Sequence, residues 1–407
     1  MSDTISHGSV PVNPRLDRLQ PYPFEKLRSL LAGVAPPAVS AIRLAIGEPQ
    51  HPTPDVIRHA LAGHLDGLST YPMTAGLEEL RETVARWFRR RYQLPRLDAA
   101  TEVLPVNGTR EALFAFAQTV VDASRPGPIV ACPNPFYQIY EGAALLAGAE
   151  PRFLNQTSCN GFDLDLDSLS EAEWARTQLL YVCSPGNPSG RVLTLDAWAA
   201  IFERADRFGF VVASDECYSE IFPDENAPPL GGLEAAHRLG RDRFQRLVVF
   251  TSLSKRSNAP GLRSGCVAGD ADLLRSFLLY RTYHGCAMSP AVQYASIAAW
   301  RNESHVRDNR ARYGEKFAAL LPMLTPVLDV QQPDGGFYLW TRVPGGDDEA
   351  FARGLFAAEH VVVLPGGYLA RDAHGVNPGN GYVRIALVPE IDDCVEAAAR
   401  IVRYCQQ

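Results

Sequence analysis

A lysine, Lys255, directly follows an apolar run in the segment FTSLSK (250–255), and Arg263 follows it eight residues later in PGLRSG. Most lysines are exposed charges without chemistry. A solvated lysine, however, needs neither small hydroxyl residues before it nor Pro, Gly and Arg after it. A lysine amine removed from water can attack a carbonyl group. The spacing therefore favours a reactive amine close to an arginine that could bind an anion.

Other polar groups also follow apolar runs. Asn187 lies in SPGNPSG, after QLLYVC, and Asp215 ends FVVASD shortly before Tyr218. Taken singly, such an Asn is usually a turn former, such an Asp is often a helix N-cap, and such a Tyr usually packs. If the runs are parallel strands, however, their carboxyl ends line one crevice. We therefore expect the amide, carboxylate, phenol and lysine amine to converge.

This combination matches pyridoxal phosphate chemistry. The amine of Lys255 can form a Schiff base with the cofactor aldehyde. The carboxylate of Asp215 can keep the pyridine nitrogen protonated, so that the ring acts as an electron sink. Asn187 and Tyr218 are suited to donate hydrogen bonds to the phenolate oxygen of the ring.

The phosphate of the same cofactor requires an arginine, hydroxyl groups and a helix N-terminus. Arg263 and Ser252 meet the first two requirements. Gly108 and Thr109 precede a helical pattern that opens at Arg110, and so meet the third. The small residues around the lysine leave room for a flat ring and its phosphate.

The elements that must position these groups alternate along the chain. Apolar runs predict buried strands at 128–132, 178–183, 210–215, 247–252 and 264–269. Helical spacing predicts helices at 110–123, 137–149 and 194–209, and the last begins at the N-cap Thr194 and ends at the C-cap Gly209. This alternation predicts an α/β fold with a mainly parallel sheet sandwiched by helices.

The pattern changes at about Pro290. Long helical stretches at 290–321, strands at 335–343 and 381–388, and a closing amphipathic helix at 391–405 predict a second, smaller α/β unit. An early helix is expected at 23–33. We therefore predict a segment 1–48 that packs with the small domain, a large cofactor-binding domain 49–289 and a small C-terminal domain 290–407.

Composition narrows the function. The net charge of −7 without a basic stripe argues against nucleic acid as a partner. No apolar run approaches the ~20 residues of a membrane helix, and the start lacks the basic and apolar regions of a secretory signal. Eight cysteines without a C-x-x-C pair and nine histidines without ligand spacing predict neither a disulfide framework nor a metal site. We expect a reduced, cytoplasmic protein.

Four motifs then resemble a known family: SPGNPSG (184–190), SDECYSEI (214–221), SLSKRSNAPGLRSG (252–265) and GYVRIAL (381–387). They look like those of class I and II aminotransferases, which are fold-type I pyridoxal-phosphate enzymes, and the resemblance runs from about residue 13 to the C-terminus. It implies that Lys255 is the Schiff-base lysine and the general acid and base. It also implies the roles given above for Asp215, Asn187 and Tyr218.

The resemblance implies further contacts. Tyr137 in PFYQIY would stack on the cofactor ring, where the alternative is core packing. Arg384 would clamp the substrate α-carboxylate, helped by the backbone at Gly47. Independently, a charge inside an apolar strand is costly unless it is paired, so the alternative for Arg384 is an internal acidic partner. Tyr71 would reach the phosphate of the neighbouring subunit, which implies a homodimer with shared active sites.

Residues 16–33 and 134–155 resemble the proteobacterial N-succinyldiaminopimelate aminotransferases of lysine biosynthesis. The resemblance implies amino transfer between N-succinyl-LL-2,6-diaminopimelate and 2-oxoglutarate, so the partners are small amino-acid and 2-oxo-acid substrates. The alternatives are an aspartate, alanine or aromatic aminotransferase, a carbon–sulfur β-lyase, or a transaminase-like regulator domain, which is disfavoured because no helix-turn-helix is appended. Candidate contacts to the distal carboxylates are Lys26, Arg28, Arg281 and His284.

Overall fold

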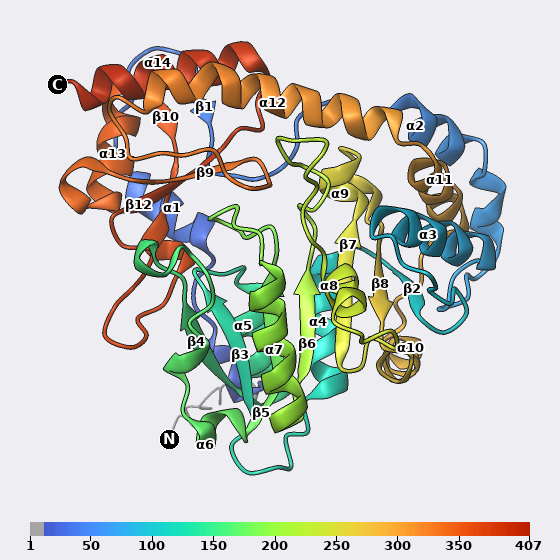
Figure 1. Ribbon diagram of the computed structural model, residues 1–407. Helices are drawn as coiled ribbons and strands as arrows, with labels where there is room; N and C mark the ends of the chain where they lie inside the picture. Colours follow the sequence, from blue (N-terminus) through green and yellow to red (C-terminus); the bar gives the residue numbers. More distant parts are fainter. Residues whose placement is uncertain (1–11) are drawn as a thin grey trace, which may run out of the picture.

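A seven-stranded sheet forms the centre of the computed structural model, which describes residues 12–407 (Figure 1). The strands lie in the order β2 (Val103–Val106), β8 (Gly265–Gly269), β7 (Leu247–Ser252), β6 (Val211–Asp215), β5 (Thr177–Cys183), β3 (Ile129–Asn134) and β4 (Glu150–Asn155). Neighbouring strands from β7 to β4 are parallel, whereas β8 is antiparallel to both of its neighbours. The sheet is therefore mainly parallel, as predicted.

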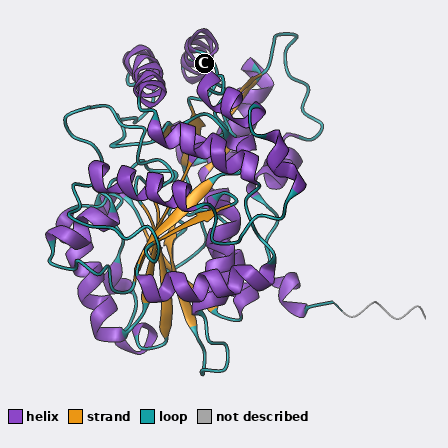
Figure 2. Ribbon diagram, turned by 90° about the vertical axis from the view of Figure 1, so that its right-hand side faces the viewer, coloured by secondary structure: helices purple, strands orange, loops and turns teal. Residues whose placement is uncertain are grey.

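Helices cover both faces of this sheet (Figure 2). Along β7, Val248 and Phe250 pack in the cluster on one face, while Leu247 and Val249 pack in the cluster on the other, as the period of two in a strand requires. One face carries α4 (Thr109–Val120), α5 (Ile139–Ala147) and α10 (Ala271–His284). The other carries α3 (Glu78–Arg91), α6 (Glu171–Trp174), α7 (Leu195–Phe208) and α8 (Gly232–Arg238).

The predicted caps of α7 are confirmed. The Thr194 side chain accepts a hydrogen bond from the Ala197 N–H at 3.2 Å, and Gly209 ends the helix with a φ of 83°. A glycine adopts this left-handed conformation without steric cost. The strand β6 that follows therefore begins at a defined point and delivers Asp215 at its carboxyl end.

The C-terminal part forms a smaller layer. Its three-stranded antiparallel sheet has the order β11 (Leu364–Pro365), β12 (Tyr382–Ala386) and β9 (Tyr338–Arg342). The helices of this part are α12 (Ser304–Leu324), α13 (Asp348–Glu359) and α14 (Ile391–Cys405). The N-terminal strand β1 (Ile42–Arg43) pairs with β10 (Val361–Val362), and α1 (Pro23–Leu31) packs beside β11. The chain therefore returns its N-terminal segment to the C-terminal layer.

One helix differs from the predicted division at residue 290. Helix α11 (Pro290–Arg301) packs on α2 (Asp55–Ala62) and α3, within the core of the large sheet. Its Trp300 lies with its ring centroid 4.7 Å from that of Trp87. The prediction placed the whole stretch 290–321, with its long helices, in the small domain, but Asn302 ends α11 before α12 begins. The first half of that stretch therefore belongs to the large part.

Two further predictions concern compartment. Within residues 12–407, no helix combines the length and the apolar character needed to cross a bilayer. The absence of a secretory signal was read from the start of the chain, where residues 1–11 lie outside the described part. All eight cysteines carry free thiols.

Candidate active site

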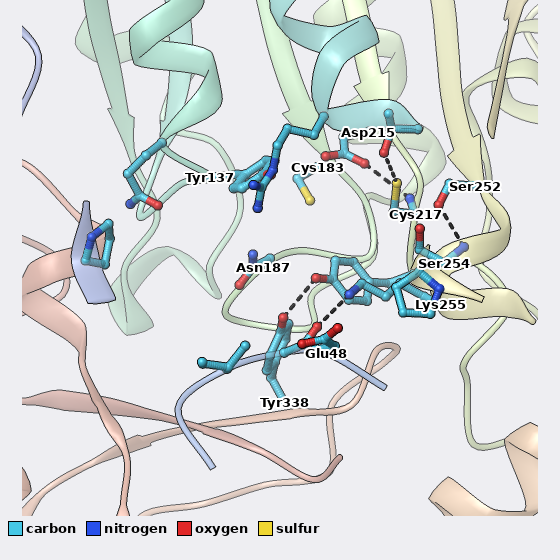
Figure 3. Close-up of a pocket in the computed structure, with 18 of the residues that line it drawn as sticks. Glu48, Tyr137, Cys183, Asn187, Asp215, Cys217, Ser252, Ser254, Lys255 and Tyr338 are labelled. Carbon is cyan, nitrogen blue, oxygen red and sulfur yellow. Dashed lines mark hydrogen bonds between the residues drawn. The ribbon is translucent and has the colours of Figure 1, made fainter. Parts of the chain in front are cut away.

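A cavity of about 490 Å³ opens at the carboxyl ends of β5, β6 and β7, where the large sheet faces the smaller layer. Lys255, Asn187, Tyr137 and Tyr338 surround its open centre (Figure 3). Apart from the four candidate contacts to the distal carboxylates, all of the site residues predicted from the sequence line the cavity except Gly108 and Tyr71. The cavity is in the size range of small-molecule sites.

Lys255 lies on the short helix α9 (Leu253–Arg256), which follows β7 directly. Ser252 caps this helix because its Oγ accepts a hydrogen bond from the Ser254 N–H at 3.0 Å. The Lys255 Nζ donates to the Gly47 carbonyl at 2.5 Å. Burial lowers the pKa of Lys255 to about 8. The nearby Cys217 acts in the opposite direction and raises this pKa, whereas the charge of Arg384 lowers it further. The amine is therefore largely neutral at mildly alkaline pH.

Asp215 ends β6 and is 4% exposed. Its Oδ2 accepts a hydrogen bond from the Tyr140 hydroxyl at 2.8 Å, and its Oδ1 accepts one from the Cys217 N–H at 3.3 Å. Burial raises the pKa of Asp215, while these hydrogen bonds and the Lys255 charge oppose the rise. A carboxylate buried in this way is suited to a cationic partner.

Tyr140 was missed by the sequence reasoning. It lies three residues after Tyr137 in PFYQIY; Tyr137 precedes α5, Tyr140 lies in its first turn, and the two rings meet edge to face with centroids 5.8 Å apart. Its ring is stacked on Tyr181, with centroids 4.7 Å apart. A second polar aromatic at this spacing was the available signal.

Tyr338 was also missed, because GGFYLW was read only as a strand. Its hydroxyl lies 2.9 Å from the hydroxyl of Tyr218. A Cβ atom on Gly47 would lie 1.9 Å from the same oxygen of Tyr338, so only glycine fits at position 47. Tyr338 therefore connects the predicted residues Tyr218 and Gly47 across the cavity.

Arg384 on β12 is 3% exposed. It donates from Nη1 to the Asn187 Oδ1 and from Nη2 to the Ala45 carbonyl, each at 2.8 Å, while its buried Nε has no partner. No carboxylate of residues 12–407 lies within 4 Å of its guanidinium. The internal acidic partner considered from the sequence is thus not found, and a carboxylate from outside the chain would fit.

The opposite end of the cavity is built to receive a second anion. Gly108, with a φ of 86°, precedes the N-terminus of α4, and a Cβ there would lie 2.2 Å from a terminal nitrogen of Arg263. Arg263 donates to the Pro260 carbonyl at 2.8 Å. Thr109 lies in the first turn, with its Oγ1 3.0 Å from the Cys217 Sγ. A helix N-terminus, a hydroxyl and an arginine together fit a phosphate.

Several predicted residues lie elsewhere. Tyr71 follows the 3-10 helix η2 (Leu65–Ser69), and its side chain is fully exposed outside this cavity. Arg281 is buried in an ion pair with Glu111, at 2.6 Å, and does not line the cavity. The other three candidates for the distal carboxylates also do not line the cavity, namely Lys26, Arg28 and His284.

The α/β fold and this cavity, with a buried amine, a carboxylate and an anion site, define a fold-type I pyridoxal-phosphate enzyme. The family model for aminotransferase class I and II matches residues 39–401, and the chain belongs to this family. Its enzymes use pyridoxal 5′-phosphate. The amine, carboxylate and phosphate-type site described above fit that cofactor.

Three similar proteins cover nearly the whole chain. LL-diaminopimelate aminotransferase of Maridesulfovibrio salexigens is 31% identical over 95% of this chain and 97% of its own. A crystal structure of an aminotransferase from Neisseria meningitidis is 56% identical, with a TM-score of 0.94 over 96% of this chain and 99% of the other. A probable N-succinyldiaminopimelate aminotransferase from Thermus thermophilus is 25% identical, with a TM-score of 0.82 over 94% of this chain and 100% of the other.

Proposed function

We propose that this aminotransferase transfers an amino group between N-succinyl-LL-2,6-diaminopimelate and 2-oxoglutarate. One observation carries the chemistry: Lys255, Asp215, Asn187 and Arg384 line a single cavity, and Arg384 has no acidic partner within the described chain. The names of the Maridesulfovibrio and Thermus proteins support a diaminopimelate-type substrate. The motifs of residues 16–33 and 134–155 support the succinylated form.

The cofactor, when bound, supplies an electron sink that makes the α-hydrogen of an amino acid acidic. Asp215 would hold the proton of its ring nitrogen, and Asn187 and Tyr218 would donate hydrogen bonds to its ring oxygen. Tyr137 would lie against the ring. These roles rest on the burial of Asp215 and on the shared cavity.

The phosphate would be held where the anion site lies. Gly108 caps α4, which opens with Thr109 and Arg110, and the backbone N–H groups of these two residues belong to the first turn, which has no intrahelical acceptors. The N–H of Gly108 donates to the Val106 carbonyl at 2.8 Å. Ser252 and Arg263 add a hydroxyl and a charge. Tyr71 would complete this end from a second copy of the chain, and its fully exposed ring is available for such a contact. We therefore propose a homodimer with shared sites.

Lys255 would move the proton. Its Nζ, with a pKa lowered by burial to about 8, can accept the proton from the substrate Cα and release it later in the same turnover. Arg384 would bind the α-carboxylate by two parallel hydrogen bonds, assisted by the backbone at Gly47. The hydrogen bond from the Lys255 Nζ to the Gly47 carbonyl places the amine in direct contact with the backbone that would assist carboxylate binding.

A second candidate substrate is LL-diaminopimelate itself, favoured by the name of the Maridesulfovibrio relative. The two compounds differ at the distal nitrogen, which is a neutral amide in the succinylated form and an ammonium in the free form. The test is kcat/KM for both compounds, and for aspartate, alanine and acetylornithine, with 2-oxoglutarate as acceptor and Lys255→Ala as the inactive control. We expect the succinylated compound to give the highest kcat/KM. Parity, or a preference for the free diamine, would contradict the assignment.

The cytoplasmic location expected from the sequence belongs to the same proposal. It is supported by the eight free thiols, because a reducing compartment keeps cysteines unpaired.

A further inference from the structure

A buried polar network contacts the main chain of Lys255 from outside the cavity. Its members are His51, Asn258, Asn309 and Lys316, each of which is at most 6% exposed. None of the four lines the cavity. Polar groups buried this deeply destabilise a fold unless they are paired. The chemistry described so far uses none of them.

One end of the network holds the main chain of Lys255. The Asn309 Nδ2 donates to the Lys255 carbonyl at 3.2 Å, and the Asn309 Oδ1 accepts from the Asn258 Nδ2 at 2.9 Å. Asn258 has a φ of 46°, a left-handed conformation that Asn adopts more readily than most residues. Asn309 therefore fixes the stretch of chain that carries the amine.

The other end of the network reaches the strand of Arg384. The Lys316 Nζ donates to the Leu387 and Val388 carbonyls at 3.1 and 3.5 Å. These two residues directly follow β12, which carries Arg384. Lys316 and Asn309 are both on α12, about two turns apart, so they share one face of that helix. One helix face therefore contacts both the Lys255 main chain and the end of the Arg384 strand.

His51 joins the two ends, and its partners fix the position of its ring proton. The Lys316 Nζ lies 2.7 Å from the His51 Nε2, and the Asn309 Oδ1 lies 2.9 Å from the His51 Nδ1. An ammonium group has only donors, so Nε2 accepts and the proton lies on Nδ1, which donates to Asn309. Burial lowers the pKa of His51, and the charge of Lys316 acts in the same direction, although the Asn309 hydrogen bond opposes both. The ring is therefore neutral, and the hydrogen bonds run in one direction from Lys316 to Lys255.

The segment that precedes His51 also contacts the functional side chains. The Gly47 carbonyl accepts from the Lys255 Nζ at 2.5 Å, and the Ala45 carbonyl accepts from the Arg384 Nη2 at 2.8 Å. Holding His51 therefore restrains a stretch of backbone that touches both the amine and the guanidinium.

Lys316 is a costly group to bury. Its three hydrogen-bond partners are all neutral, whereas the buried Arg256 pairs with the carboxylate of Glu303 at 2.6 Å. Apolar side chains of similar size would fill the same space without removing a charge from water. Stability alone therefore gives no reason for a charged group at this position.

We propose that His51, Asn309 and Lys316 are positioning residues for the reaction. They touch no reacting atom, but they hold the Lys255 main chain in a fixed place relative to the strand of Arg384. The amine then meets the Cα of a substrate whose carboxylate is bound by that arginine. This inference rests on the proposed role of Lys255 as the proton carrier, because proton transfer slows steeply when its two atoms are displaced.

The experiment measures a single half-reaction of the holoenzyme. Saturating glutamate, with hydrogen or deuterium at Cα, discharges the visible absorbance of the bound cofactor, and the time course gives a rate constant. An inactive fraction changes only the amplitude of this signal and not the rate constant. For His51→Phe and for Lys316→Met, we expect the rate constant to fall about 10-fold. The deuterium effect should be at least as large as in the wild type, because proton transfer itself is slowed.

A double variant separates positioning from stability. His51→Phe alone leaves the Lys316 charge against an apolar ring, whereas His51→Phe combined with Lys316→Met removes both partners. The double variant should therefore melt at a higher temperature than His51→Phe. A positioning role predicts that its rate constant nevertheless stays about 10-fold low. If the rate constant recovered together with the stability, the proposal would be overturned. The double variant also supplies the rate measurement if His51→Phe does not fold.

Tyr313→Phe is the matched control. Tyr313 is buried on the same helix, its ring centroid lies 4.8 Å from that of His51, and its hydroxyl has no partner within residues 12–407. Removing this hydroxyl changes a polar group beside His51 without breaking a hydrogen bond, so the rate constant should not change. Wild-type rate constants in the network variants would contradict the proposal. So would slow ones whose deuterium effect falls toward one, because another step would then be limiting.

Failure of the proposed function would give a different result. An active Lys255→Ala would remove this lysine from proton transfer, whatever the network variants show. If glutamate did not discharge the absorbance of the wild type, the proposed acceptor pair would be wrong, and the amino donor would replace glutamate in the same comparison.

Discussion

The two walls of the cavity are built in different ways. One wall consists of the carboxyl ends of β5, β6 and β7 with the start of α4, and each of its functional groups follows its element within a few residues. The other wall combines residues 22–24, residues 46–48, β9 and β12, which come from widely separated parts of the chain. The first wall presents the amine, the carboxylate and the phosphate-type site, and the second presents Arg384 and Tyr338.

The difference shows where each kind of chemistry can be found. In a parallel sheet, backbone hydrogen bonding fixes which strand ends are neighbours, so the first wall follows from local patterns. The second wall depends on how a separate layer packs, and its residues meet only in the tertiary structure. Substitutions on the two walls should therefore fail in different ways.

Loss of the amine on the first wall should have the largest effect. We expect Lys255→Ala to lower turnover at least about a thousandfold, because both the nucleophile and the proton carrier are removed. Steady-state assays together with circular dichroism would show inactivity in a folded chain. Lys26→Ala, outside the cavity, should keep its activity. If Lys255→Ala retained a tenth of the activity, Lys255 on the first wall would not be the catalytic amine.

The main effect on the second wall should be on binding. We expect Arg384→Ala to weaken substrate binding by about 2–5 kcal/mol, since it removes one partner of a desolvated charge pair. The measurement is KM and kcat for the amino donor, with Arg342→Ala on the exposed part of β9 as control. A wild-type KM would mean that the second wall does not hold the α-carboxylate.

The pH dependence of cofactor binding by Lys255 tests whether the charge of Arg384 on the second wall affects the pKa of the amine on the first wall. A lysine amine reacts only when it is neutral, that is, above its pKa. Because burial lowers the pKa of Lys255 to about 8, from an ordinary value of 10.5, the capture rate of cofactor-free protein should rise with pH, with its midpoint near 8, and level off at higher pH. Rapid-mixing absorbance would record this. Arg384→Ala should move the midpoint upward, because the Arg384 charge also lowers this pKa, whereas a wild-type midpoint near 10.5 would contradict the burial of the amine.

The smallest effect should come from the contact between the walls. Tyr338→Phe removes the hydroxyl that lies 2.9 Å from the Tyr218 hydroxyl and keeps the ring under the Arg384 guanidinium. We expect kcat/KM to fall about 3- to 10-fold, the range of a hydrogen bond worth about 1 kcal/mol. Tyr404→Phe on α14, far from the cavity, is the control. An equal effect of the two substitutions would assign Tyr338 to packing alone.

The same division explains what could be predicted from the sequence. Strands β3, β5, β6, β7 and β8, the α/β class and the convergence of Asn187, Asp215 and Lys255 followed from apolar runs and the residues that end them, whereas the outer strands β2 and β4 were not predicted. The antiparallel direction of β8 and the packing of α11 on Trp87 did not, because neither is encoded in local periodicity.

Residues that act through tertiary contacts were equally out of reach. Tyr338 lies in a strand pattern with no polar neighbour to mark it, and its meaning arises only when Gly47 and Tyr218 approach. Arg384 was found because a charge in an apolar strand is conspicuous, whereas a tyrosine there is not.

The lack of space at Gly47 also bears on attempts to change the range of accepted amino acids. Any larger residue there would collide with the Tyr338 oxygen and disturb the carbonyl that holds the lysine. A directed-evolution library should therefore leave this position fixed. Variation belongs at Ile46 and Glu48, which flank it, are exposed, and face the same cavity.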